Sequence, residues 1–293
     1  MTKKEIIALI DLLDDPDENV FQEIRSRLIK EGLSVVQALE GAWINNYDAL
    51  RQKRIENIVH RIQFNNIDSK LNEWARLGAN SIYTGALLVA KYQYPELDEE
   101  EVRSIIDKIK NDVWLELNDN LTGLEKVKVL NHILFKEYGF VGNKEDYHNP
   151  KNSFINKVIE SKKGNPLTLS IIYLILAQEL EIPISGVNLP EHFVLAYTDK
   201  YGVLSPDENK EMHGVLFYIN PFSNGQVFGK KDIIDFLKQL NIEPEDRYFQ
   251  PCSNIQMIIR MMNNLKFAYK KLGKEEKADE MNYLIRKLMK NIN

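Results

Sequence analysis

Hydrophobic residues in the first 75 positions recur every three or four residues, which is the spacing of amphipathic helices. The pattern runs from Ile6 to Leu13, from Val20 to Leu28 and from Val35 to Ile62, and it breaks at residues 14–17 and at Gly32. Aspartate, proline and glycine at the breaks are typical of helix ends and turns. The sequence therefore predicts short helices joined by short turns in residues 1–75.

The segment from Leu12 to Gly32 resembles one unit of a HEAT-type helical repeat. Because about three repeats are needed for an independently stable stack, one unit leaves two interpretations open. Residues 1–75 are either a HEAT-like N-terminal region or a small helical cap on a larger domain.

Helical spacing continues from about residue 72 to 138, with predicted helices at 74–92, 98–117 and 121–137. Turn-forming residues then fill the segment from 139 to 153. An apolar helix is predicted at 166–180, and strands are predicted at 186–189, 192–197 and 215–219. A polar connection over 198–214 reads as a long hairpin loop. The alternation of helices with a few strands predicts an α+β fold.

The last forty residues return to helical spacing, with apolar faces at 257–269 and 281–288 and a turn at Gly273. This helical hairpin resembles a single tetratricopeptide-type repeat. We therefore predict three regions: a helical region over 1–75, an α+β core over 76–250 and a C-terminal hairpin over 251–293.

Composition limits the class of function. The chain has 38 basic and 43 acidic residues and a net charge of −5, which gives no basic footprint for nucleic acid. No run of apolar residues is long enough to span a membrane. The lone cysteine, Cys252, cannot form an internal disulfide, and we expect it to be a small buried or capping residue. These features favour a cytoplasmic protein; they leave the oligomeric state open.

The middle of the chain holds residues in an order that suggests chemistry. A Gly164-Asn165-Pro166 turn opens the apolar helix, a predicted strand begins at His192, and the next strand ends at Asn220. Papain-like and transglutaminase-like enzymes use this order for a cysteine at a helix N-terminus, its histidine base and a residue that orients the imidazole. We therefore expect His192 and Asn220 to be neighbours.

Longer motifs carry a more specific resemblance, over roughly residues 80–290. They are an Asn-x-x-Leu-Phe stretch followed by Gly-Phe-x-Gly-Asn (131–143), an Asn-Ser pair (152–153), Gly-x-Pro-x-x-Leu-Ser (164–170) and Pro-x-His-Phe (190–193). The chain is similar in these motifs to the SirB-type branch of the transglutaminase-like superfamily. The resemblance implies a central helix packed on a small antiparallel sheet.

The same resemblance places the nucleophile position on Pro166, which has neither a nucleophile nor a proton to transfer. Proline is usual at this position in the branch, and it suits the first position of a helix, with Asn165 as the N-cap. Two residues depart from the usual pattern: Asn220 replaces an orienting aspartate, and Glu191 replaces the glycine before the histidine. We expect the Glu191 side chain to point away from His192, as neighbours on a strand do.

Three functional hypotheses follow. The first is a non-catalytic pseudoenzyme that binds a protein or peptide in the relic cleft, with His192, Asn220, Asn165 and Glu191 as binding residues. The second is a hydrolase or acyltransferase in which Ser170 or Thr168 acts as nucleophile with His192, although a serine there more often bonds a carbonyl one turn back.

The third hypothesis is a small-ligand binder that performs no chemistry. No cofactor is expected under any of the three. His132, His148 and His192 have no partner at metal-ligand spacing, so no metal site is expected either.

Overall fold

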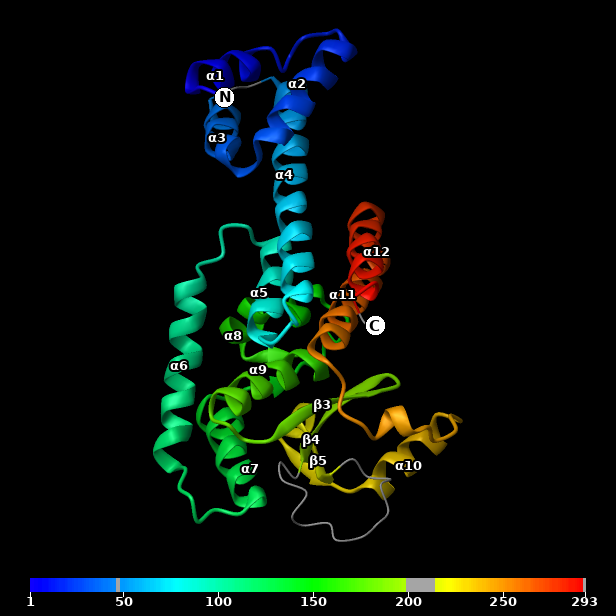
Figure 1. The fold of residues 1–293 in the computed structure, drawn as a ribbon. Coiled ribbons are helices and arrows are strands. Elements are labelled where there is room, and N and C mark those ends of the chain that lie inside the picture. The colour runs from blue at the N-terminus through cyan, green and yellow to red at the C-terminus, as the bar shows by residue number, and fades with distance from the viewer. Residues whose placement is uncertain (46–47, 199–213, 292–293) are drawn as a thin grey trace. The chain divides into compact units, whose positions relative to one another are not determined.

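The structure is a computed structural model that describes residues 1–45, 48–198 and 214–291 (Figure 1). Contacts divide the chain into two compact units, Met1–Glu73 and Trp74–Asn293. Helix α4 (Ala49–Arg76) begins in the first unit and ends in the second. Nearly all of the predicted polar connection over 198–214 lies outside the described residues.

The first unit is helical, as the hydrophobic spacing predicts, but the expectation of short helices is wrong for α4, which has 28 residues. Its helices are α1 (Lys3–Asp11), α2 (Glu18–Glu31), α3 (Val36–Ile44) and the first part of α4, with a 3₁₀ turn η1 (Gly32–Val35). Buried Arg54 donates to the Leu13 and Asp15 carbonyls and stacks over Phe21. Whether these helices form a HEAT-type unit stays a prediction.

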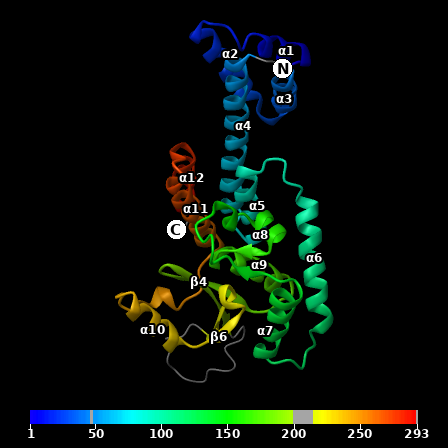
Figure 2. The ribbon, with the colours of Figure 1, turned by 180° about the vertical axis from the view of Figure 1, so that it is seen from behind.

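The second unit contains the remaining elements. Its helices are α5 (Ile82–Gln93), α6 (Glu99–Glu116), α7 (Gly123–Asn131), α8 (Ile155–Ser161), α9 (Pro166–Glu179), α10 (Lys230–Gln239), α11 (Asn254–Lys271) and α12 (Glu275–Met289). Short helical turns are the π-helix η2 (His132–Glu137) and the 3₁₀ turns η3 (Pro150–Ser153), η5 (Pro221–Ser223) and η6 (Asp246–Tyr248). Figure 2 shows α6 running along one side of this unit.

One predicted helix is wrong in its extent. The structure divides the segment 74–92 into the end of α4 and a separate helix α5, with a turn between them. Gly78 and Ala79 adopt positive φ of 93° and 50° in that turn, and Ser81 caps α5. The apolar spacing continues across the turn because residues on both sides of it, such as Trp74 and Ile82, are buried. Periodicity alone therefore could not reveal the break.

The sheet confirms the predicted strands and adds one. Strands β3 (Ile184–Leu189), β4 (His192–Thr198), β5 (Val215–Asn220) and β6 (Gln226–Phe228) form an antiparallel sheet in that order. Strand β6 was not predicted, because it has only three residues and lies at the edge of the sheet. A separate parallel pair joins β1 (Val141–Gly142) to β2 (Lys163–Gly164).

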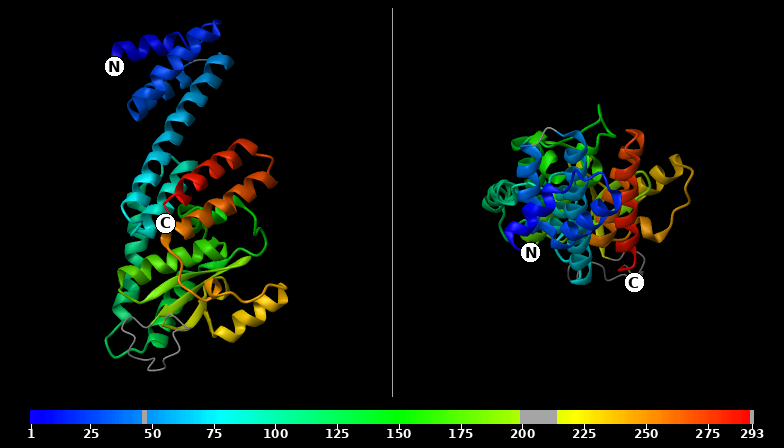
Figure 3. Two further views of the ribbon diagram at one scale, coloured as in Figure 1. Left: turned by 45° about the vertical axis from the view of Figure 1, so that its right-hand side comes forward. Right: turned by 90° about the horizontal axis from the view of Figure 1, so that it is seen from above.

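Helix α9 is the buried centre of the second unit. Every residue from Pro166 to Ala177 is buried, and the helix packs on strands β3 and β4. The hairpin of α11 and α12 turns at Gly273, as predicted, and α11 packs against α5 and α9 (Figure 3). These layers confirm an α+β fold with a central helix on a small antiparallel sheet. The assignment of residues 251–293 as a separate region stays a prediction.

Gly85 marks a close approach between helices. A Cβ atom at this position of α5 would lie 2.7 Å from the Trp74 ring and 2.9 Å from Ile258 of α11. Such distances are shorter than real contacts, so a larger residue would displace one of its neighbours. Glycine here allows α5 and α11 to pack closely despite its cost inside a helix.

No helix within the described parts of the chain is both long and apolar enough to cross a membrane.

Candidate functional site

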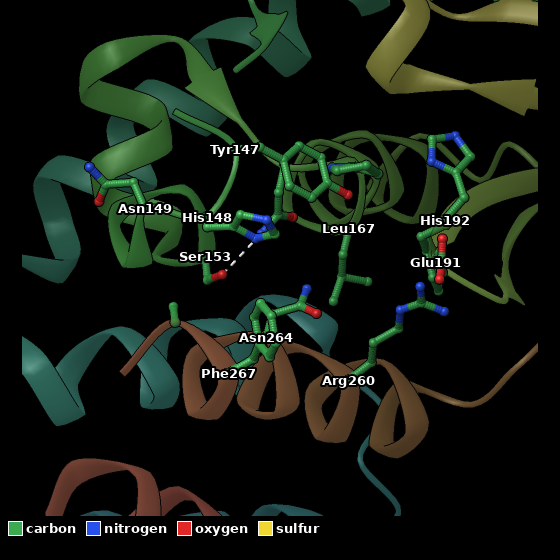
Figure 4. A pocket seen from close by; sticks show the side chains of 14 residues that line it. Tyr147, His148, Asn149, Ser153, Leu167, Glu191, His192, Arg260, Asn264 and Phe267 are labelled. Atoms are coloured by element: carbon green, nitrogen blue, oxygen red, sulfur yellow. Dashed lines mark hydrogen bonds between the residues drawn. The ribbon is translucent and has the colours of Figure 1, made fainter. Parts of the chain in front are cut away.

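A cleft of about 590 Å³ lies in the second unit. Its walls come from the loop 147–153, the start of α9, the turn between β3 and β4, and one face of α11 (Figure 4). These segments are far apart in the sequence. The cleft therefore exists only because the sheet, the central helix and the C-terminal hairpin pack together.

The start of α9 is built as the sequence predicts. Asn165 is the N-cap, and its Oδ1 accepts from the Thr168 amide at 2.9 Å. Pro166 occupies the first helical position. The backbone amide at this position has no partner within a helix, so proline, which lacks the amide hydrogen, costs no hydrogen bond there. Both residues line the cleft.

His192 and Asn220 are neighbours on adjacent strands, which confirms the prediction. The His192 Nε2 and Asn220 Oδ1 atoms lie 3.2 Å apart. Because Asn220 Oδ1 also accepts from the Phe222 amide at 3.1 Å, it is the acceptor, and His192 Nε2 must donate. In the neutral ring this leaves Nδ1 unprotonated. Among the described residues, no protein group bonds Nδ1.

Two effects of its surroundings favour the neutral form of His192. Burial lowers the pKa of the imidazole most, and the positive charge of Arg260 lowers it further. The hydrogen bond to Asn220 raises the pKa but does not outweigh burial. His192 lines the cleft, whereas Asn220 is not one of the lining residues.

A chain of amide hydrogen bonds holds the loop 143–153 against the start of α9. Asn143 donates to Asn152 Oδ1 at 2.9 Å, and Asn152 donates to the Asp146 and Tyr147 carbonyls. The Asn165 amide then donates to Ser153 Oγ at 2.9 Å, the dashed line in Figure 4. The Asn-Ser pair and Asn143 therefore position the cleft wall.

Asn131, the first residue of the longest motif, also has a structural role. Its amide donates to the Gly225 carbonyl at 2.8 Å, and its Oδ1 accepts from the Tyr173 hydroxyl at 3.1 Å. This links α7, the turn before β6 and the buried helix α9. The π-helix that follows was predicted as ordinary helix.

The expectation that Glu191 lies on a strand is wrong. It lies in the two-residue turn between β3 and β4, not on a strand, with φ of 54°. Proline at 190 followed by a positive φ is the pattern of a type II turn, in which glycine is favoured at the second position. Glu191 is exposed at the cleft and carries its only carboxylate within the described lining.

The two hydroxyl candidates are not in the cleft. Ser170 is fully buried, and its Oγ donates to the Pro166 carbonyl at 2.8 Å, the local bond expected of a serine inside a helix. Thr168 is also fully buried, and its hydroxyl has no partner in the described residues. Neither residue lines the cleft with His192.

The remaining candidates are separate from one another. Cys252 is a free thiol just before α11, outside the cleft, and burial raises its pKa to about 12. His148 lines the cleft, but His132 is exposed and pairs with Glu137 at 3.4 Å. Within the parts of the chain that the structure describes, no group of three or more metal-ligating side chains comes together.

Sequence reasoning missed the α11 wall of the cleft. Arg260, Asn264 and Phe267 project from α11 toward the other walls (Figure 4). A signal was present: Arg260 stands three residues after buried Met257 and therefore on the inward face of the helix. A charged residue in an apolar stripe is a candidate for function.

Comparison with protein families identifies the fold. A model described as the transglutaminase-like superfamily matches residues 100–263, more than half of the chain. This chain belongs to the transglutaminase-like superfamily. The matched segment contains the His192–Asn220 pair, the start of α9 and Arg260.

Proteins similar to this chain match different lengths of it. A UPF0162 protein of Xylella fastidiosa (strain 9a5c) is 27% identical over 212 residues, which are 70% of this chain and 71% of the relative. A UPF0162 protein of Vibrio cholerae is 25% identical over 193 residues, 65% and 67% of the two chains. Human F-box only protein 21 is 35% identical over 68 residues, 23% of this chain and 11% of that protein. No solved structure gives a significant match.

Proposed function

We propose that this chain is a non-catalytic, SirB-type member of the superfamily that binds a protein or peptide in the cleft beside His192. The observation that carries the proposal is Pro166. It stands at the first position of α9, in the same cleft as His192. The resemblance to transglutaminase-like enzymes assigns their cysteine to this position. A proline side chain can neither attack a carbonyl nor transfer a proton.

The rest of the site supports binding. The loop 143–153 is fixed to α9 through buried amides, so the cleft wall is already ordered. Its surface mixes the aromatic rings of Tyr147 and Phe267 with hydrogen-bonding groups such as Asn264. Pre-organised clefts of this size with a few placed polar groups are typical ligand sites.

The hydrolase hypothesis has less support. An activated hydroxyl nucleophile needs a base within hydrogen-bond reach. Ser170 donates to a backbone carbonyl, and both Ser170 and Thr168 are completely buried away from the cleft that His192 lines.

Selection from a display library of random peptides, using the full chain as bait, tests the proposal. Enriched peptides should not bind the variant Asn264→Trp, because the larger side chain would fill the cleft. Asn264 forms no described hydrogen bond, so its replacement removes none. The peptides should keep binding to Lys270→Trp, an exposed position on the same helix. Enrichment of no peptide, or of peptides indifferent to Asn264→Trp, would overturn the proposal.

A further inference from the structure

Arg260 is a largely buried arginine held by neutral groups. From α11 its Nη1 donates to the Asn188 side-chain oxygen and to the Leu189 carbonyl at the end of β3. The guanidinium also lies over the Phe193 ring, 5.8 Å from its centroid. Within the described residues, it forms no ion pair with any aspartate or glutamate. A buried charge of this kind is ordinarily compensated by a carboxylate.

The two hydrogen bonds occupy one end of the guanidinium. Nε–H and the Nη2–H beside it point in parallel along one edge of the group, and that edge matches the two oxygens of a carboxylate. No described protein group accepts from either atom. Because Arg260 lines the cleft, its free edge is available to a molecule that enters it.

Among the described residues that line the cleft, Arg260 is the one arginine or lysine and Glu191 is the one carboxylate. Burial lowers the pKa of Arg260, but the guanidinium stays protonated at neutral pH. Glu191 is in an exposed turn, where solvent screens its charge. In the same lining, Phe267 is 50% exposed and Tyr147 is 39% exposed, and the two offer apolar surface.

We infer that the Nε/Nη2 edge of Arg260 is a carboxylate subsite for a peptide, with an apolar or aromatic residue of that peptide packed on Tyr147 and Phe267. The carboxylate is either a C-terminus or an Asp/Glu side chain. This inference rests on the proposed peptide-binding function and specifies the chemistry that the cleft recognises.

Three acetylated dipeptides test the subsite by NMR titration of the full chain. Ac-Ala-Phe has a free C-terminal carboxylate, Ac-Asp-Phe-amide has only a side-chain carboxylate, and Ac-Ala-Phe-amide has neither. We expect at least one acidic probe to bind about tenfold more tightly than the neutral probe, as a charge-assisted bidentate contact predicts. The acidic probe that binds more tightly identifies the source of the carboxylate.

Variants then assign the preference to Arg260. Arg260→Gln should abolish it, and Arg260→Lys, which keeps the charge but loses the fork, should reduce it about threefold or more. Arg247→Gln is the matched control, because Arg247 is exposed, pairs with Glu245 and does not line the cleft. Glu191→Gln removes a negative charge from the cleft and should tighten binding of the acidic probes. Because it keeps Arg260 and its hydrogen bonds, this variant tests the inference even if Arg260→Gln fails to fold.

Equal binding of the three probes, or no binding of any, would overturn the inference. A preference that survives in folded Arg260→Lys and Arg260→Gln would do the same. The two proposals fail separately. If the acidic probes bind through Arg260 but no library peptide binds in the cleft, the carboxylate subsite is supported and the peptide-binding function is contradicted. If library peptides that lack a carboxylate bind in the cleft, the peptide-binding function is supported and the carboxylate subsite is contradicted.

Discussion

At the scale of single residues, the chemistry of the site rests on how His192 is held. Asn220 fixes the proton on Nε2, and burial disfavours the imidazolium. The folded protein therefore binds a proton at His192 less readily than the unfolded chain does. Between the lowered folded pKa and the unfolded value near 6.5, the unfolded state carries more protons, so stability rises with pH.

His192→Gln tests this linkage. The contribution of neutral His192 is fully present above about pH 6.5 and is lost as the pH falls toward the folded pKa. The variant has no histidine to titrate at this position. As the pH falls, the free energy of unfolding of the wild type should therefore decrease more than that of His192→Gln. Urea unfolding at pH 7.5, 6.5 and 5.5 measures it. Parallel curves at all three pH values would contradict the pKa direction.

Pro166→Cys tests whether Pro166 occupies the lost nucleophile position. The substitution would place a thiol at a helix N-terminus in the cleft of His192, and such sites lower a thiol pKa to about 3.5–7.5. The first helical residue needs no amide bond, so the backbone should tolerate it. We expect alkylation by iodoacetamide at pH 6.5 to be much faster than at Cys252, whose pKa burial raises to about 12.

Adding His192→Ala to Pro166→Cys is the matched test of the pair, and it should slow the alkylation. No turnover is expected, because stabilisation of an oxyanion requires further groups. Labelling as slow as that of Cys252, or unaffected by His192→Ala, would show that the comparison with catalytic relatives fails at its centre.

Glu191→Gly tests backbone strain in the turn before His192. A non-glycine residue at φ of 54° has an unfavourable left-handed conformation. Glycine removes that cost but gains freedom in the unfolded chain, so the net gain in stability should be about 0.5–1 kcal/mol. Urea unfolding gives the value. A less stable variant would mean that the Glu191 side chain contributes contacts beyond those described.

At the scale of elements, the loop 143–153 depends on buried Asn152. This side chain uses both its amide hydrogens and its oxygen within the loop. Asn152→Ala removes three partly buried hydrogen bonds and should cost about 2–3 kcal/mol in the free energy of unfolding. Asn149→Ala, at a less buried position of the same loop, should cost about 1 kcal/mol or less. Equal effects of the two would contradict a central role for Asn152.

Local pattern predicted most elements, and long-range packing decided the rest. The helix at 166–179, its Asn165 cap and strands β3 to β5 follow from spacing and capping chemistry. The break at Gly78–Ala79 and the π-helix could not be predicted, because the apolar stripe continues through both. Arg260 was missed for a different reason: its role arises from contact with the end of β3, some 70 positions earlier.

At the scale of the whole molecule, the predicted division after residue 75 can be tested with two fragments. Residues 70–293 keep Trp74, which donates to the Ser81 carbonyl and packs on Gly85, whereas residues 77–293 lose it. We expect the longer fragment to unfold cooperatively and the shorter one to be less stable by about 3 kcal/mol or more. Calorimetry of both checks this. Aggregation of the longer fragment would mean that residues 1–69 belong to the main core.

The close packing at Gly85 has a consequence for how this cleft can diversify. Ile258, which a methyl group at Gly85 would displace, lies two residues before Arg260 on the helix that forms one wall. A substitution at Gly85 would therefore shift α11 and change the width of the cleft without replacing any residue that lines it. Related chains could acquire different ligand preferences through such buried positions while their cleft residues remain identical.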